Sequence, residues 1–279
     1  MLTKTISVSS EAKEHDRGFH AAFLAVKQAR SQHVAVRPHR AMTPLKVTPY
    51  LLAQALILPI VLCAALLWGK PHILDFWRDC VVFWSGGLGL PFIRAAQLTE
   101  TGQYVSRLSS AGVSPVMPGG MTLLVTAVVA LGGLALSLNM KNKTLPLKYP
   151  LRIVCVVQLV ALLYFWLVPG SFPYSIARHS EELMTIGYTV MLATPVMLAV
   201  GYYILNQSLL IKLFHTVLIL GFFAILVPHQ VLAQAVIMQH LSVLFMPVLY
   251  ICFGAVFDAL VFVALYSWVA SKAPANATV

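Results

Sequence analysis

Long apolar runs without charged residues, separated by short polar segments, fill the chain from about residue 50 onward. An α-helix needs about 20 such residues to cross the hydrocarbon core of a bilayer. Six runs approach this length, and we expect each to be a membrane span: Tyr50–Trp68, Met121–Leu138, Leu151–Val168, Leu183–Leu205, Leu209–Val227 and Val243–Val269. The pattern therefore predicts an all-α polytopic membrane protein with about six transmembrane helices.

Leu74–Trp84 has a different pattern, with aromatic residues on one helical face and charged residues on the other. This is typical of a helix that lies along a membrane surface. Val81–Leu98 can be drawn as a further span, but it contains Pro91 and Arg94, and its uninterrupted apolar part is too short to cross. We therefore expect an interfacial helix, within a segment (Pro71–Gly120) that is long for a plain connection.

Pro228–Ser242 joins the last two expected spans. If it continued the final span, that helix would exceed about 50 Å in length, against a hydrocarbon core of about 30 Å. We expect the segment to lie flat on the membrane or to dip in and out of it. His229 and His240 would then touch lipid headgroups, since polar ring tips favour that zone.

The stretch Pro173–Leu205 places dense charge directly before an apolar run. Ser180 followed by two acids is typical of a helix start, because serine accepts a free backbone N–H and acids complement the helix dipole. Pro195 should kink the helix that follows. The alternative is a polar cluster at the membrane face that binds a headgroup, an ion or a partner loop. The cluster would consist of Arg178, His179, Glu181 and Glu182. The same four residues are the candidate catalytic residues.

Two polar residues fall inside the expected spans. Asp258 lies near the middle of the last span, where a charged carboxylate costs at least about 2.5 kcal/mol to insert. Gln158, in the third span, is the nearest match in depth. We hypothesise a hydrogen bond between Asp258 and Gln158, with the acid neutral or linked to water. The alternative is an acid that contacts a partner subunit or the backbone of its own bundle.

Composition supports a membrane protein, and charge gives an orientation. The 279 residues are 59% hydrophobic and 10% charged, with a formal net charge of +10, whereas a soluble domain has about a quarter charged residues. If the N-terminus is cytoplasmic, most Lys and Arg lie in residues 1–46 and in the other segments on the cytoplasmic side. This is the distribution that the positive-inside rule predicts. The excess charge then meets anionic lipid, and nucleic acid is excluded as a partner.

The expected organisation has three parts. Residues 1–46 form a cytoplasmic basic tail, 47–272 a membrane domain with an extracytoplasmic segment at 69–120, and 273–279 a cytoplasmic tail. Within the first tail, Phe19–Arg30 has the spacing of a short amphipathic helix suited to the inner leaflet. A solvated tail with chance spacing is the equal alternative.

Motifs for a cofactor or a metal ion are absent from the sequence, so we expect neither. There is no nucleotide-binding loop, no HExxH and no GxSxG. The four cysteines have neither metal-type nor disulfide-framework spacing; they are Cys63, Cys80, Cys155 and Cys252.

These features favour a multi-pass component of an inner or plasma membrane without a catalytic centre of its own. It would be a permease-like subunit or an accessory protein of an envelope export or assembly system. Its partners would be membrane lipids and a protein partner or second copy within the membrane. The alternative is a membrane-embedded enzyme acting at the outer face on a lipid-linked or peptide substrate, through His179 with Glu181 or Glu182. The first is favoured because no complete catalytic set can be assembled.

Overall fold

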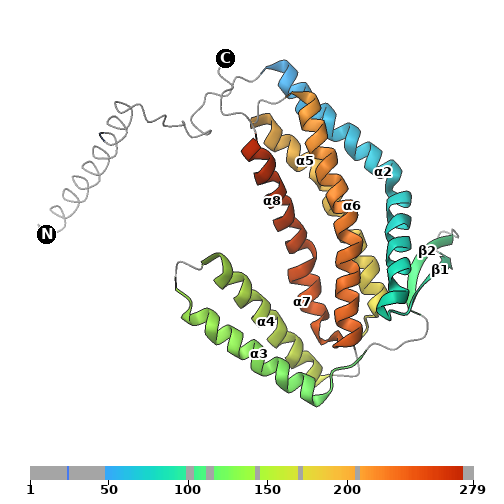
Figure 1. The fold of residues 1–279 in the computed structure, drawn as a ribbon, viewed down its shortest axis with the longest axis vertical. Coiled ribbons are helices and arrows are strands. Elements are labelled where there is room, and N and C mark those ends of the chain that lie inside the picture. The colour runs from blue at the N-terminus through green and yellow to red at the C-terminus, as the bar shows by residue number, and fades with distance from the viewer. Residues whose placement is uncertain are drawn as a thin grey trace, which may run out of the picture. The chain divides into compact units, whose positions relative to one another are not determined.

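The structure is a computed structural model that describes residues 24, 48–98, 104–110, 116–141, 145–168, 172–204 and 208–272. Six helices between residues 48 and 272 are long and apolar enough to cross a membrane. The chain is therefore an all-α polytopic membrane protein, as predicted (Figure 1). The amphipathic helix expected at Phe19–Arg30 lies outside the described residues apart from Leu24, and so do both expected tails.

The main helices are α2 (Pro49–Ser85), α3 (Gly120–Asn139), α4 (Leu145–Leu167), α5 (Ile176–Ile204), α6 (Leu209–His240) and α8 (Val256–Lys272). The sixth span, Val243–Ser271, joins α8 to the short elements before it. Between α2 and α3 lie the turn η2 (Gly86–Leu88) and the strands β1 (Phe92–Leu98) and β2 (Tyr104–Ser110). Three short turns precede α8, namely η5 (Val243–Phe245), α7 (Met246–Tyr250) and the π-helical turn η6 (Ile251–Ala255).

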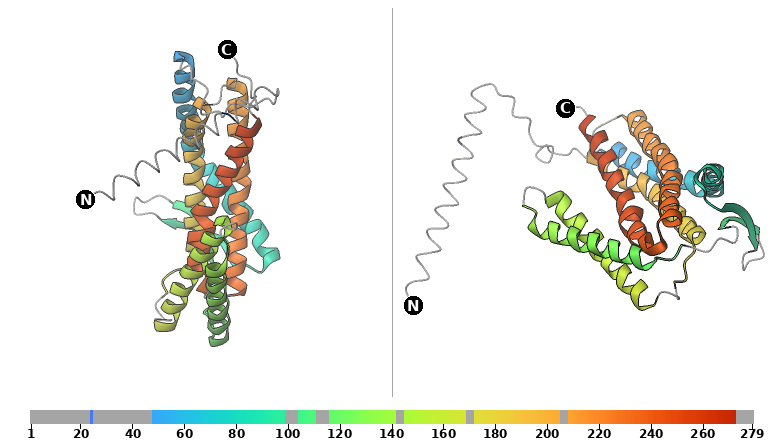
Figure 2. Two further views of the ribbon diagram at one scale, coloured as in Figure 1. Left: turned by 90° about the vertical axis from the view of Figure 1, so that its left-hand side faces the viewer. Right: turned by 60° about the horizontal axis from the view of Figure 1, so that its bottom comes forward.

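Helices α2, α5 and α6 pack against one another, and α8 packs against α5 and α6. Helix α3 packs chiefly against α4, and this pair joins the rest where α4 contacts η5 and α7 (Figure 2). Small residues let helices approach closely in membranes. A Cβ atom added at Gly187 would lie 2.6 Å from a methyl carbon of Val227, so α5 and α6 meet at this glycine.

Helix α2 is longer than expected. It runs unbroken through the Leu74–Trp84 segment, which is therefore the continuation of a span and not a separate interfacial helix. Its 37 residues extend about 55 Å, and Figure 1 shows the helix changing direction on the way. Pro71 lies inside it, and a proline inside a helix is the usual cause of a kink. The apolar face found in the sequence is divided: Trp77 and Val81 are fully buried, whereas Phe76 and Trp84 are about half exposed.

Helix α6 also continues where a break was expected. Pro228–Ser242 neither lies flat nor dips back, because α6 extends to His240 and buries Val231 and Met238 there. The two histidines bond to backbone carbonyls of the protein: His229 Nδ1 lies 2.7 Å from the oxygen of Ile225, and His240 Nε2 lies 3.2 Å from that of Leu88.

The antiparallel hairpin β1–β2 was not predicted from the sequence. Its register places Arg94 opposite Leu108, and Phe92 and Leu108 are both buried. Strand β1 contacts α2, and β2 contacts α5 and α2. Val81–Leu98 is divided between the end of α2, η2 and β1, so it is not a further span.

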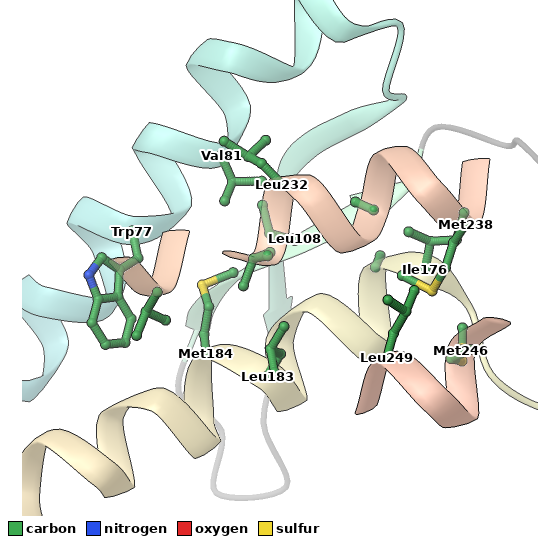
Figure 3. Packing of buried hydrophobic residues seen from close by; sticks show 14 of the residues in the cluster. Trp77, Val81, Leu108, Ile176, Leu183, Met184, Leu232, Met238, Met246 and Leu249 are labelled. Carbon is green, nitrogen blue, oxygen red and sulfur yellow. The ribbon is translucent and has the colours of Figure 1, made fainter. Parts of the chain in front are cut away.

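The hydrophobic core is concentrated where this hairpin meets the helices. Figure 3 shows Trp77 and Val81 of α2, Leu108 of β2, Met184 of α5 and Leu232 of α6 facing one another. The Trp77 indole Nε1–H donates to the carbonyl of Ala224, at 2.8 Å. We call this region, with the C-terminal parts of α2 and α6 and the N-terminal part of α5, the hairpin end.

Candidate functional site

The four residues of the expected cluster lie at the start of α5, but they face three different surroundings. Arg178 and Glu182 form an exposed pair, with 3.0 Å between Nε and Oε1. The guanidinium of Arg178 also lies 4.9 Å from the centre of the Tyr174 ring. His179 and Glu181 point away from this pair and have separate partners. The expected single cluster is therefore not formed.

The helix start that was assigned to Ser180 is one turn earlier. Helix α5 begins at Ile176, and the hydroxyl of Ser175 accepts the backbone N–H of Arg178 at 3.2 Å. Ser180 lies inside the second turn and is fully buried, and within the described part of the chain its hydroxyl has no hydrogen-bond partner. Ser180 is therefore not the N-cap.

Glu181 holds the β hairpin against the helices. Its two carboxylate oxygens accept Nε and Nη2 of Arg78, each at 2.9 Å, and Oε1 also accepts the backbone N–H of Leu108 at 2.7 Å. Arg78 is 7% exposed. A bidentate pair of this kind fixes both side chains, because the planar guanidinium matches the carboxylate. One carboxylate thus ties α5 to α2 and to β2.

The ion pairs continue outward from Arg78. Its Nη1 lies 3.2 Å from Asp75, and Asp75 also accepts Nη2 of Arg94 at 2.9 Å. Arg94 pairs with Asp79 as well, and its Nε donates to the hydroxyl of Ser106 at 2.9 Å. We call these residues, with Glu181, the charge network.

The charge network was not predicted from the sequence. A partial signal was present, because Asp75, Arg78 and Asp79 share one helical face. The pairing with Arg94 requires β1 to fold back along α2, and the hairpin that does this was not recognised. Glu181 was singled out, but its partner lies 103 positions away in the sequence.

His179 faces the interior of the bundle. It is 2% exposed, and its Nε2 lies 2.9 Å from Oε1 of Gln234. The amide Nε2 of Gln234 donates to the carbonyl of Phe253 at 2.7 Å, which turns its oxygen toward the histidine. A carbonyl oxygen only accepts, so Nε2 of His179 carries the proton.

The Phe253 carbonyl is free to accept these bonds because the helix is broken beside it. Gly254, in η6, has φ −100° and ψ −119°, which is outside the helical range. Such π-helical turns disturb the regular backbone ladder and occur often at functional sites. Gln230 donates its amide to the same carbonyl. We call His179, Gln234, Gln230 and the Phe253 carbonyl the polar line.

Asp258 follows this break. It is 1% exposed, and among the described residues neither carboxylate oxygen has a hydrogen-bond partner. The amide of Gln230 lies near it. The hydrogen bond hypothesised with Gln158 is absent, since Gln158 donates instead to the carbonyl of Leu244 at 3.3 Å. The reason is that α4 packs on η5 and α7, so depth alone did not make Gln158 a neighbour of Asp258.

No group of three or more His, Cys, Asp or Glu side chains is arranged to hold a metal ion in the part of the chain that the structure describes. A groove of about 680 Å³ opens between α2, from Ala55 to Cys63, and α5, from Val196 to Val200. Its lining is apolar except for Cys63, whose thiol donates to the carbonyl of Leu192 at 3.4 Å.

The arrangement does not form a catalytic pair from the predicted residues. His179 bonds to a neutral amide, while Glu181 is neutralised by Arg78 and Glu182 by Arg178. A general base must reach the group it deprotonates and be oriented for it, and His179 is enclosed by side chains of its own chain. Comparisons with protein-family models, curated proteins and solved structures found no match to this chain.

Proposed function

We propose that the chain is a multi-pass membrane component without a catalytic centre of its own, acting as a permease-like subunit or as an accessory protein of an envelope export or assembly system. The observation that supports this most is that Glu181 and His179, two of the candidate catalytic residues, make contacts that hold the fold together. Glu181, paired with Arg78 of α2, binds the hairpin to the helices, and His179 binds α6. These contacts build the protein and leave no oriented nucleophile and base among the predicted residues.

The proposed place is an inner or plasma membrane, with both termini in the cytoplasm. The support is the distribution of Lys and Arg along the sequence. The hairpin end then faces the outside, as an ordered surface built on α2 and α5. A partner protein in the membrane or envelope, or a second copy of the chain, would use that surface.

Cysteine labelling tests the orientation. Ser110→Cys and Asn142→Cys would be made separately in a chain whose four native cysteines are replaced by serine or alanine. A reagent that cannot cross the membrane should label position 110 in intact cells, and position 142 only after the cells are opened. Labelling of both positions from one side would contradict the proposed topology.

Affinity purification in mild detergent, followed by mass spectrometry, tests the role. We expect a membrane or envelope protein to co-purify reproducibly, and not to co-purify with an unrelated six-span protein carrying the same tag. In cells that depend on the chain, His179→Ala should act only through stability, so a variant that is folded and abundant should still function.

The enzyme alternative gives the opposite result. It would be favoured if the chain purified alone turned over a lipid-linked or peptide substrate, and a folded His179→Ala protein lost that activity. Thr189→Ala is the matched control, because it removes an exposed polar group from the same helix and was not a candidate catalytic residue.

A further inference from the structure

Asp258 is a buried carboxylate of the bundle interior for which the described residues supply no hydrogen-bond partner. Its carboxylate is almost fully buried and has no hydrogen bond within the described part of the chain. None of the ion pairs among the described residues includes it. An ionised carboxylate in such surroundings is strongly disfavoured, because nothing replaces the water it has lost.

Among the described residues, the elements that pack most extensively on α8, and from which a counter-charge would come, are η6, α5 and α6. On α5, Arg178 and Glu182 pair with each other, Glu181 pairs with Arg78, and His179 bonds to Gln234. The hydroxyl of Tyr188, also on α5, donates to the carbonyl of Leu66 at 3.0 Å. On η6 the titratable side chain is Cys252, a free thiol without a positive charge.

Helix α6 supplies no counter-charge either. Lys212 donates to the amide oxygen of Gln54 at 3.2 Å, near the end of the bundle opposite the hairpin. The ring of His215 packs beside Trp268, and His229 and His240 bond to carbonyls. What α6 brings close to Asp258 is the neutral amide of Gln230.

Gln230, like Asp258, has a buried oxygen without a hydrogen-bond donor among the described residues. Its amide nitrogen donates to the Phe253 carbonyl, whereas its oxygen is buried and has no donor among the described residues. Two neighbouring acceptors, the carboxylate and the amide oxygen, thus both lack a hydrogen. A proton on Asp258 would serve both, since a carboxylic acid donates one hydrogen bond.

We propose that Asp258 is a proton-binding site within the membrane bundle, and that its protonated form donates to the amide oxygen of Gln230. A metal cation is the weaker choice, because hard cations prefer about six oxygen ligands and the described surroundings offer three oxygens that lack a partner. The inference stands independently of the proposed function.

The polar line gives this site a route to the hairpin end. His179 lies about 5 Å along α5 from the start of that helix, and Gln230 lies about 15 Å along α6 from its end, at 1.5 Å per residue. Between them, Gln234 and Gln230 share the Phe253 carbonyl at the helix break. When Asp258 gives up its proton to water, the bare carboxylate needs a donor, and the Gln230 amide N–H is the one at hand. That N–H would leave the Phe253 carbonyl, so proton release would loosen the break at Gly254.

Infrared spectroscopy of the purified full chain in lipid nanodiscs tests the site. We expect a carboxylic acid C=O stretch at neutral pH that Asp258→Asn removes. Glu182→Gln, which alters an exposed paired acid, should leave the band unchanged. Gln230→Leu should shift the band to higher frequency, because the acid loses its hydrogen-bond acceptor.

Three results would overturn the proposal. The first is an acid band at neutral pH that is the same in the wild type and in Asp258→Asn. The second is failure of both Asp258→Asn and Asp258→Leu to fold where the wild type is stable, since both lack the charge of an ionised carboxylate. The third is stabilisation of the wild type, but not of Asp258→Asn, by sodium chloride over choline chloride, which would make the site one for a metal cation.

Discussion

The charge network contains a partly buried acid, Glu181, and the polar line ends beside a fully buried one, Asp258, yet the two acids have opposite surroundings. Glu181 is 18% exposed at its side chain and receives three donors, from Arg78 and the Leu108 N–H. Asp258 is more deeply buried and receives none from the described residues. Buried charges are normally paired and hydrogen-bonded, so Glu181 is explained by the fold and Asp258 is not. The comparison teaches that the charged stretch of the sequence around Glu181 has a structural role. The acid without an evident structural role is Asp258, which stands alone in an apolar run.

Helix α5 separates the two regions. His179 and Glu181 are two positions apart, so they point about 200° apart around the helix. The first bonds to α6 and the second to α2 and β2. One short polar stretch therefore contributes to both regions, and single substitutions in it can disturb one without the other.

The largest effect is expected when the charge network loses Glu181. Glu181→Ala leaves Arg78 buried with Asp75 alone, and removes the acceptor of the Leu108 N–H. Breaking one side of a buried pair costs about 3–5 kcal/mol. The free energy of unfolding in mixed detergent micelles should fall by that amount, and hydrogen exchange at β2 should accelerate. A change smaller than that of the exposed pair below would show that Glu181 does not hold the hairpin.

A smaller loss is expected from the polar line. Gln234→Leu removes the acceptor of His179 and one donor to the Phe253 carbonyl. Leaving buried polar groups without partners costs about 1–3 kcal/mol. Gln158→Leu is the matched control, since that amide has one longer bond, to Leu244. Exchange at β2 should stay unchanged in both, and an acceleration there would mean that the two regions are coupled.

The two serines of α5 distinguish a helix cap from a buried hydroxyl. Ser175→Ala should cost about 1 kcal/mol, because it removes the acceptor of the Arg178 N–H. Ser180→Ala should not lower stability, because it removes a buried hydroxyl that makes no bond within the described residues. The same thermal unfolding assay reads both. A larger cost at Ser180 would restore it as the cap.

The smallest effect is expected at the exposed pair of α5. Arg178→Ala removes its contact with Glu182, where the arginine side chain is 60% exposed. Exposed pairs contribute about 0–1 kcal/mol and weaken with salt. The free energy of unfolding should therefore be slightly lower for this variant than for the wild type at low salt, and the two values should become equal at high salt. A loss that persists at high salt would indicate that Arg178 contacts something other than Glu182 and Tyr174.

The candidate sites were only partly predictable. Glu181 and His179 stood out because charge is rare in this chain, and Asp258 because it interrupts an apolar run. Their partners could not be read from the sequence. Arg78 reaches Glu181, and Gln234 reaches His179, only after α2 and α6 pack against α5. Depth suggested Gln158 for Asp258, but depth does not say which helices are neighbours.

The sequence by itself determined the membrane class and the six spans, because both follow from the length of apolar runs in one local segment. It also indicated correctly that Val81–Leu98 is not a further span. Tertiary structure decided where α2 and α6 end. Each runs on past the length a bilayer needs, because its extra turns bury Trp77 and Met238 in a core that other helices supply. It also decided the hairpin, whose strands are held by Glu181 of a distant helix. Contacts with elements distant in the sequence decided these features against the local pattern, and a local segment of the sequence carries no information about such contacts.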